Sequence, residues 1–402
     1  MGLYRMFASR TGWSLSPNPL MEAAAERRRR GLPLLDLTES NPTRCGFAYD
    51  AEKILKALAN PRSLQYEPDP RGLLRAREVV ADYYAQRGVK VSPNQVFLTA
   101  STSESYSYAF RLLANPGDAV LAPQPSYPLF DYLAGLNDVA IIPYPLVYGE
   151  GWQIDQRALA SRLENRARAI LVVHPNNPTG SFLRRGELAF LLRCCRDRGL
   201  ALIADEVFAD YAFAPGHGGG PDEERVVSHA ATTEALTFTL SGLSKISGLP
   251  QMKLAWLVVT GPAEDVRDAL PRLEIIADTY LSVSAPVANA LPELLDLRRT
   301  LQPQILERTQ SNLCWLDGQL SPPSPVSRLR VEGGWYVILK VPSVRSDEQW
   351  ALRILHAEGV LVHPGHFFDF QSEGHLVTSL LSPPEVFQEG IRRLLRLVSG
   401  GG

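Results

Sequence analysis

The chain has 402 residues, of which 45% are hydrophobic and 21% are charged, and its formal net charge is -2. This composition is typical of one large or two medium globular domains and excludes wholesale disorder. The balanced charge does not indicate nucleic acid or an anionic membrane as a partner. No apolar run reaches the roughly 18 residues of a membrane span, and we find no secretory signal. The four cysteines form no CxxC pair, so we expect reduced thiols and a cytoplasmic protein.

Seven apolar runs predict buried strands in the first two thirds of the chain. They are Val96–Ser101, Ala119–Tyr127, Val139–Pro145, Ala169–Pro175, Ala201–Glu206, Thr237–Gly242 and Leu254–Thr260. The runs are continuous rather than alternating, which is typical of strands covered on both faces. Helical patterns lie between several of them, and one of these has an apolar stripe that ends at Gly199. This alternation predicts an α/β domain with a mainly parallel, seven-stranded sheet.

The rest of the chain predicts a smaller α+β unit. A long helical pattern runs from about Pro286 to Leu320, an alternating strand follows within 330–341, and a last helix is expected over 384–398. We expect the N-terminal segment to join this unit, which gives a large domain at 48–288 and a small domain of 1–47 with 289–402. The Gly-rich segment Pro215–Arg225 predicts a mobile surface loop.

Polar side chains follow five of the predicted strands, at the edge where open α/β sheets bind ligands. They are Ser101, Thr102, Ser103, Tyr127, Asn177, Asp205 and Lys245. An amine can form an imine with an aldehyde, and a buried carboxylate can keep a ring nitrogen protonated. Hydroxyls and N–H groups at a helix start suit a phosphate. The set therefore predicts pyridoxal 5'-phosphate as cofactor. No metal-ligand spacing appears.

Each of these residues also has an ordinary interpretation when it is taken alone. Lys245 could be a solvated loop lysine, Asp205 a helix N-cap, and Asn177 part of a plain Asn-Pro turn. Tyr127 could simply be a core residue. The order of the surrounding motifs favours the chemical interpretation.

Six motifs together carry a resemblance to a known family. They are YEPDPRG (66–72), TASTSES (99–105), PSYPLF (125–130), HPNNPTG (174–180), DEVFADY (205–211) and SGLSKISGLPQMKLAW (241–256). In this order and spacing, and over nearly its whole length, the chain resembles the class I/II aminotransferases of the fold-type-I pyridoxal-phosphate enzymes. The resemblance implies that fold, a homodimer with shared active sites, and transfer of an amino group from an amino acid to a 2-oxo acid.

The resemblance also implies a role for individual residues. Lys245 is the Schiff-base lysine and proton shuttle, and Asp205 pairs with the pyridine N–H. Asn177 holds the ring oxygen, and Tyr127 stacks on the ring. The phosphate contacts are Ser101, Thr102, Ser103, Ser244, Lys253 and, from across the dimer interface, Tyr66.

Three positions near the cofactor depart from the family pattern. Phe208 stands where a tyrosine usually bonds the ring oxygen. Gly242 replaces a common serine, whose phosphate contact would pass to Ser241 or Ser244. Lys253 replaces an arginine, and a lysine cannot fork onto phosphate as a guanidinium does.

A fourth departure concerns the substrate. Val377 aligns with the arginine that usually clamps the α-carboxylate, and such a bidentate clamp is hard to replace. Arg44 is our candidate substitute, and His363 and His366 are alternatives. Asn41 and Trp335 are further candidate substrate contacts. The missing arginine leaves open a lyase or decarboxylase on the same fold as an alternative to an aminotransferase. A non-catalytic protein that binds the cofactor is a third hypothesis.

Overall fold

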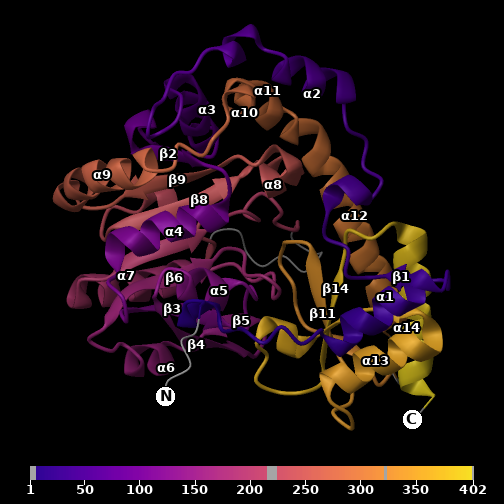
Figure 1. The fold of residues 1–402 in the computed structure, drawn as a ribbon. Coiled ribbons are helices and arrows are strands. Elements are labelled where there is room, and N and C mark those ends of the chain that lie inside the picture. The colour runs from indigo at the N-terminus through magenta and orange to yellow at the C-terminus, as the bar shows by residue number, and fades with distance from the viewer. Residues whose placement is uncertain (1–5, 215–223, 321–323, 401–402) are drawn as a thin grey trace.

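The computed structural model describes residues 6–214, 224–320 and 324–400, so most of the predicted loop at Pro215–Arg225 lies outside the described residues. Two main sheets of unequal size lie side by side, with helices around them (Figure 1). Within the described ranges, no helix is long and apolar enough to cross a bilayer. In the same ranges, no group of three or more His, Cys, Asp or Glu side chains is placed to hold a metal ion.

The large sheet has eight strands in the order β2-β9-β8-β7-β6-β3-β4-β5. Their bounds are β2 (Val96–Thr99), β3 (Ala119–Gln124), β4 (Ala140–Tyr148), β5 (Trp152–Ile154), β6 (Ala167–Val173), β7 (Ala201–Asp205), β8 (Thr237–Gly242) and β9 (Ala255–Thr260). β9 runs antiparallel to both neighbours and β5 antiparallel to β4, whereas the other neighbours are parallel. All seven predicted runs are strands. The eighth, β5, was missed because its three residues form no apolar run.

Helices cover both faces of this sheet, which explains why the seven predicted strands are continuous apolar runs. On β6, Ala169 and Leu171 pack into one hydrophobic cluster, whereas Ile170 and Val172 pack into another on the opposite face. The helices of this part are α2 (Ala51–Leu58), α3 (Leu74–Ala85), α4 (Thr102–Leu113), α5 (Phe130–Gly135), α6 (Gln156–Ser161), α7 (Arg185–Arg198), α8 (Leu243–Ile246) and α9 (Ala263–Asp278). As predicted, α7 stops at Gly199, whose φ of 64° is left-handed.

The small sheet has the order β10-β11-β14-β13 and is antiparallel. Its strands are β10 (Ser327–Arg328), β11 (Tyr336–Lys340), β13 (His363–Pro364) and β14 (His375–Ser379). Around it lie α1 (Pro19–Arg29), α13 (Asp347–Glu358) and α14 (Pro384–Ser399) (Figure 1). The N-terminal segment joins this part, because α1 packs on α13 and β1 (Leu35–Asp36) pairs with β12 (Val360–Leu361). The exact domain limits stay a prediction.

The predicted long helix is divided into three. It consists of α10 (Ala285–Asn289), α11 (Leu291–Asp296) and α12 (Arg298–Gln319). Pro292 occupies the first turn of α11, where a proline without its N–H is tolerated, so a new helix can begin there. An apolar period alone does not reveal such a restart.

The register of the large sheet brings separate segments to one edge. Asp205, at the end of β7, pairs with Val173 at the end of β6. On β9, Ala255 pairs both with Thr99, the last residue of β2, and with Gly242, the last residue of β8. The segments that follow β2, β6, β7 and β8 therefore start at the same edge.

Candidate active site

Lys245 lies on α8, a single turn of helix directly after β8. Its side chain is half-buried, and Nζ lies 4.9 Å from the centre of the Trp335 ring and 5.6 Å from that of Phe208. The Tyr211 hydroxyl donates to the backbone carbonyl of Lys245 at 2.6 Å. Burial lowers the pKa of Lys245 to about 8, and the Asp205 carboxylate opposes that shift. More of this amine is neutral, and so nucleophilic, near pH 7 than of an ordinary lysine.

Asp205 is held from two sides at the end of β7. Its side chain is buried, Oδ1 accepts a hydrogen bond from the Val207 N–H at 3.0 Å, and Oδ2 accepts one from the Tyr106 hydroxyl at 2.8 Å. Burial raises the pKa of Asp205 to about 6, while both hydrogen bonds oppose the shift. Above that pH the carboxylate is ionised and suited to a cationic ring N–H.

Asn177 presents a buried amide with a free acceptor. Its Oδ1 is buried and has no hydrogen-bond partner among the described residues. The loop is fixed by its neighbours: Asn176 Oδ1 accepts from the Thr179 hydroxyl at 2.9 Å, and the Asn176 carbonyl accepts from the Gly180 N–H at 2.7 Å. Gly180 has a φ of 67°, and a Cβ there would lie 2.4 Å from the carbonyl of Gly333. A buried amide oxygen without a partner fits a site built for a polar ligand.

Tyr127 follows β3 and lies near the same carboxylate. Its ring contacts Phe130 edge-on, with centroids 5.6 Å apart. Burial raises the pKa of Tyr127 to about 12, and the charge of Asp205 adds to the shift. The hydroxyl therefore stays protonated, and the aromatic ring is what Tyr127 can offer a flat ligand.

The N-terminus of α4 lies next to this group in the register. Ser101 caps the helix, since its Oγ accepts from the Glu104 N–H at 3.2 Å. Glu104 in turn accepts from the Ala100 N–H at 2.7 Å. Thr102 and Ser103 form the first turn of this 12-residue helix, so their N–H groups lie at its positive end. This is an arrangement that suits a phosphate.

The other predicted phosphate contacts come from the segment after β8. Ser244 precedes Lys245 on α8 and is half-buried, whereas Lys253 is exposed and adopts a left-handed φ of 51°. A Cβ at Gly242 would lie 2.7 Å from the Cβ of Ala255 on β9. The close approach of these two strands thus explains the glycine in place of a serine.

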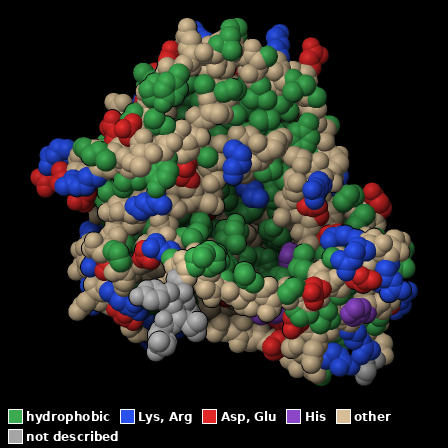
Figure 2. All heavy atoms as spheres, viewed as in Figure 1, with side chains coloured by type: hydrophobic (Ala, Val, Ile, Leu, Met, Phe, Trp, Pro, Cys, Tyr) green, Lys and Arg blue, Asp and Glu red, His purple; other side chains and the backbone are tan. Residues whose placement is uncertain are grey.

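The small sheet presents an apolar surface on the other side of Lys245. Trp335 is fully buried, and its ring contacts those of Phe208 and Tyr211 edge-on at 5.1 Å each. Tyr336 packs both on the cluster that holds Trp335 and on the cluster around β14. In the same view as Figure 1, this face is hollowed between the two sheets, and hydrophobic side chains gather there (Figure 2).

Val377 belongs to the core of the small sheet. It lies on β14, has no exposed area, and packs with Leu329, Ile338 and Phe368. His363 pairs with Val377 across the sheet, and burial lowers the pKa of His363 to about 4, so this imidazole is neutral near pH 7. The strand position expected to hold an arginine is therefore part of a core.

Three predicted residues lie apart from this group. Arg44 has 74% of its side chain exposed and a long ion pair of 3.9 Å with Glu39. The Asn41 side chain serves its own turn, where it accepts from the Thr43 N–H at 3.1 Å and hydroxyl at 2.8 Å. Tyr66 is 80% exposed. The Arg44 side chain is thus directed outward, and that of Asn41 is engaged locally. Tyr66 is free to contact another molecule.

Comparison with known proteins identifies the family. The profile described as "Aminotransferase class I and II" matches residues 34–394. The chain belongs to the class I and II aminotransferase family. This family uses pyridoxal 5'-phosphate.

Aminotransferases are also the similar proteins of known function and structure. The chain is 25% identical to the glutamate-pyruvate aminotransferase AlaA of Haemophilus influenzae, covering 95% of this chain and 94% of that protein. It is 28% identical to the alanine aminotransferase of Mycobacterium bovis, covering 89% and 84%. The alanine aminotransferase of Pyrococcus furiosus has the same fold, with a TM-score of 0.86 at 22% identity over 98% of this chain and 100% of that one.

Family membership settles the reaction type. The protein is an aminotransferase, and its relatives carry that activity in their names. The lyase, decarboxylase and non-catalytic hypotheses are therefore set aside. The fold prediction, a large mainly parallel sheet with a smaller α+β part, is confirmed by the aminotransferase neighbours.

Sequence reasoning did not single out Tyr106, which contacts the candidate site through Asp205. It is fully buried on α4 and donates to Asp205. In the sequence it lies on the same helical face as Ala109 and Phe110, a pattern that is typical of a core residue. The available signal was its position, one helical turn after Thr102, on the face that covers the sheet.

Proposed function

We propose that this aminotransferase binds pyridoxal 5'-phosphate at the carboxyl edge of the large sheet, with Lys245 as the attachment point. The observation that carries the proposal is the juxtaposition of a half-buried amine, a doubly hydrogen-bonded buried carboxylate and a buried amide. The amide oxygen of Asn177 has no partner among the described residues, and a polar atom of the cofactor would satisfy that amide.

Each residue has a chemical task in this proposal. When bound, the cofactor supplies a ring that accepts the electron pair left on the substrate carbon. Lys245 Nζ would take the proton from that carbon and deliver it to the carbon that carries the aldehyde of the free cofactor, for which a pKa of about 8 is well suited. Asp205 holds a proton at the ring nitrogen. Asn177 and Tyr127 fix the ring, by a hydrogen bond and by stacking.

The phosphate is held by the other polar groups at the same edge. The proposed contacts are Ser101, Thr102, Ser103, Ser244 and Lys253, with Tyr66 reaching in from a second subunit. The positive end of α4 supports this assignment, because an anion is stabilised by unsatisfied helix N–H groups.

For substrates, we propose a neutral amino acid with a small or apolar side chain and a 2-oxo acid. The rings of Trp335 and Phe208 beside the amine favour apolar groups over charged ones. Alanine is named in the relative from Mycobacterium bovis. Arg44 and Asn41 stay candidates for the carboxylate, and binding would have to turn the Arg44 side chain inward.

We further propose a cytoplasmic homodimer with shared active sites. All four cysteines are free, as expected for a reducing compartment. Tyr66 and Leu74 are exposed and line a groove of about 460 Å³ with Leu281 and Ala288. An exposed apolar groove of this kind supports contact with another subunit.

The test is a titration of the purified protein, loaded with pyridoxal 5'-phosphate, against a panel of amino acids without any oxo acid. We expect the visible band of the bound cofactor to bleach with one donor and return when a 2-oxo acid is added. Borohydride reduction followed by peptide mass spectrometry should place the cofactor on Lys245. A protein that binds no cofactor, or a label on another lysine, would overturn the proposal.

A further inference from the structure

The carboxylate of Asp205 has an unusually complete set of partners. The Val207 N–H occupies Oδ1 at 3.0 Å, and the Tyr106 hydroxyl occupies Oδ2 at 2.8 Å. The side chains of Asp205 and Tyr106 are almost completely buried. Tyr106 is the only phenol that bonds Asp205 within the described residues.

Tyr106 is itself held rigidly. Its ring contacts Phe110 at 6.0 Å and Phe130 edge-on at 5.5 Å, and Phe130 in turn contacts the ring of Tyr127. Tyr106 lies on α4 one turn after Thr102, so the helix whose start suits a phosphate also carries the hydroxyl on Asp205. The two ends of a bound cofactor would thus be fixed by one rigid element.

The surroundings of Asp205 have opposing effects on its protonation. Burial and the neighbouring Glu206 favour its neutral form, whereas Lys245 and the Tyr106 hydroxyl favour its ionised form. Tyr127 faces it as well and stays protonated. A hydrogen bond donated to a carboxylate stabilises the ionised form specifically, because a protonated acid is a much weaker acceptor.

We propose that Tyr106 is a positioning residue for amino transfer, whose hydroxyl keeps Asp205 ionised and oriented toward the ring nitrogen of the cofactor. The inference rests on the proposed function. It assigns to α4 a second role besides phosphate binding. The protonation of the ring nitrogen would then depend on a residue of α4 as well as on Asp205 itself.

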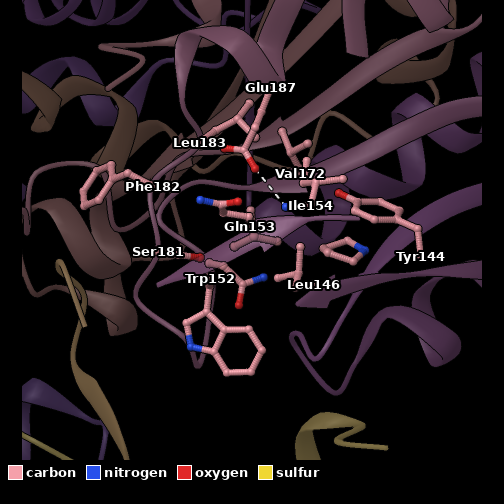
Figure 3. A pocket seen from close by; sticks show the side chains of 13 residues that line it. Tyr144, Leu146, Trp152, Gln153, Ile154, Val172, Ser181, Phe182, Leu183 and Glu187 are labelled. Atoms are coloured by element: carbon pink, nitrogen blue, oxygen red, sulfur yellow. Dashed lines mark hydrogen bonds between the residues drawn. The ribbon is translucent and has the colours of Figure 1, made fainter. Parts of the chain in front are cut away.

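The test compares Tyr106→Phe with a matched control, Tyr144→Phe. Tyr144 is equally buried and donates to the Leu171 carbonyl at 2.8 Å, so the same hydroxyl is lost. Its ring borders a cavity of about 30 Å³ (Figure 3), whose lining includes neither Lys245 nor Asp205. The readout is the dissociation constant of pyridoxal 5'-phosphate from pH 5 to 9, followed by the absorbance of the bound cofactor.

In the wild type and in Tyr144→Phe, we expect affinity to weaken as the pH falls through about 6, where Asp205 becomes protonated. In Tyr106→Phe the midpoint should move upward by about one pH unit, while the affinities converge at high pH. A 3-fluorotyrosine at position 106 keeps the ring and makes its hydroxyl a stronger donor, so it should move the midpoint downward.

The outcomes separate the two claims. A wild-type protein that binds no pyridoxal 5'-phosphate sinks the proposed function. A wild-type protein that binds it, with Tyr106→Phe and Tyr144→Phe giving superimposable pH curves, sinks the role of Tyr106 alone. If Tyr106→Phe does not fold, the fluorinated protein decides, and an unchanged midpoint there counts against the inference.

Discussion

The two sides of the candidate active site differ sharply in chemistry. At the edge of the large sheet, Lys245 and Asp205 are charged or readily charged groups, and hydrogen bonds hold the Asp205 carboxylate in place. On the side of the small sheet, Trp335 and Val377 are fully buried and apolar. Even His363, beside Val377, is neutral near pH 7 because it is buried.

This difference indicates that the two sheets have different roles in the site. The large sheet carries the proposed chemistry, because parallel strand ends bring polar side chains from distant segments to one edge. The small sheet offers shape and apolar area, which discriminate between substrates by packing rather than by charge. Substitutions that alter the charge or polarity of one side test this division.

The largest effect is expected on the large-sheet side, from Lys245→Arg. This change keeps a cation but removes an amine that can lose its proton, so turnover should fall by about 10⁴-fold or more. The measurement is the rate of bleaching of the bound cofactor by the amino donor. Lys340→Arg, at an exposed lysine on β11, is the matched control and should retain the wild-type rate. A variant of Lys245 with ordinary turnover would place the chemistry elsewhere.

A smaller effect is expected on the small-sheet side, from Val377→Arg. An arginine there would be buried among Leu329, Ile338 and Phe368, and it should lower the free energy of unfolding by about 3 to 5 kcal/mol. Urea unfolding measures the loss. The same substitution at Val344, which is 78% exposed, should change stability by less than about 0.5 kcal/mol.

The opposite result at Val377 would also be informative. A variant that unfolds like the wild type and binds acidic donors more tightly would mean that position 377 opens onto the substrate. The small-sheet side would then be a carboxylate site from which the arginine has been lost, not an apolar surface.

The two regions also differ in how far the sequence predicted them. The seven main strands follow from continuous apolar runs, because strands covered on both faces leave no polar positions. Lys245, Asp205 and Asn177 follow from the ends of those runs. β5 was not predicted because three residues form no recognisable pattern. The break at Pro292 was not predicted because it leaves the helical period almost intact.

Side-chain partners on the other element of a contact could not be predicted. Tyr106 looks like any buried aromatic residue of α4, and only the packing of that helix brings its hydroxyl to Asp205. Arg44 was predicted to replace the missing clamp, yet its side chain is largely exposed beside Glu39. These side-chain contacts depend on tertiary geometry, which local sequence patterns do not predict.

The smallest effect is expected from His363, as a change in the pH dependence of stability. The pKa of His363 is lowered by burial from 6.5 to about 4, although Asp36 opposes the shift, so unfolding exposes a group that then binds a proton. Stability from this residue is present above pH 6.5 and is lost as the pH falls toward 4, by about 2 kcal/mol at pH 5. His363→Leu should remove that part of the acid sensitivity in urea unfolding between pH 7 and 5. His356→Leu, at an exposed histidine of α13, should leave it intact. Parallel curves for all three proteins would mean that burial does not lower the pKa of His363, and that the small-sheet side is more polar than its packing indicates.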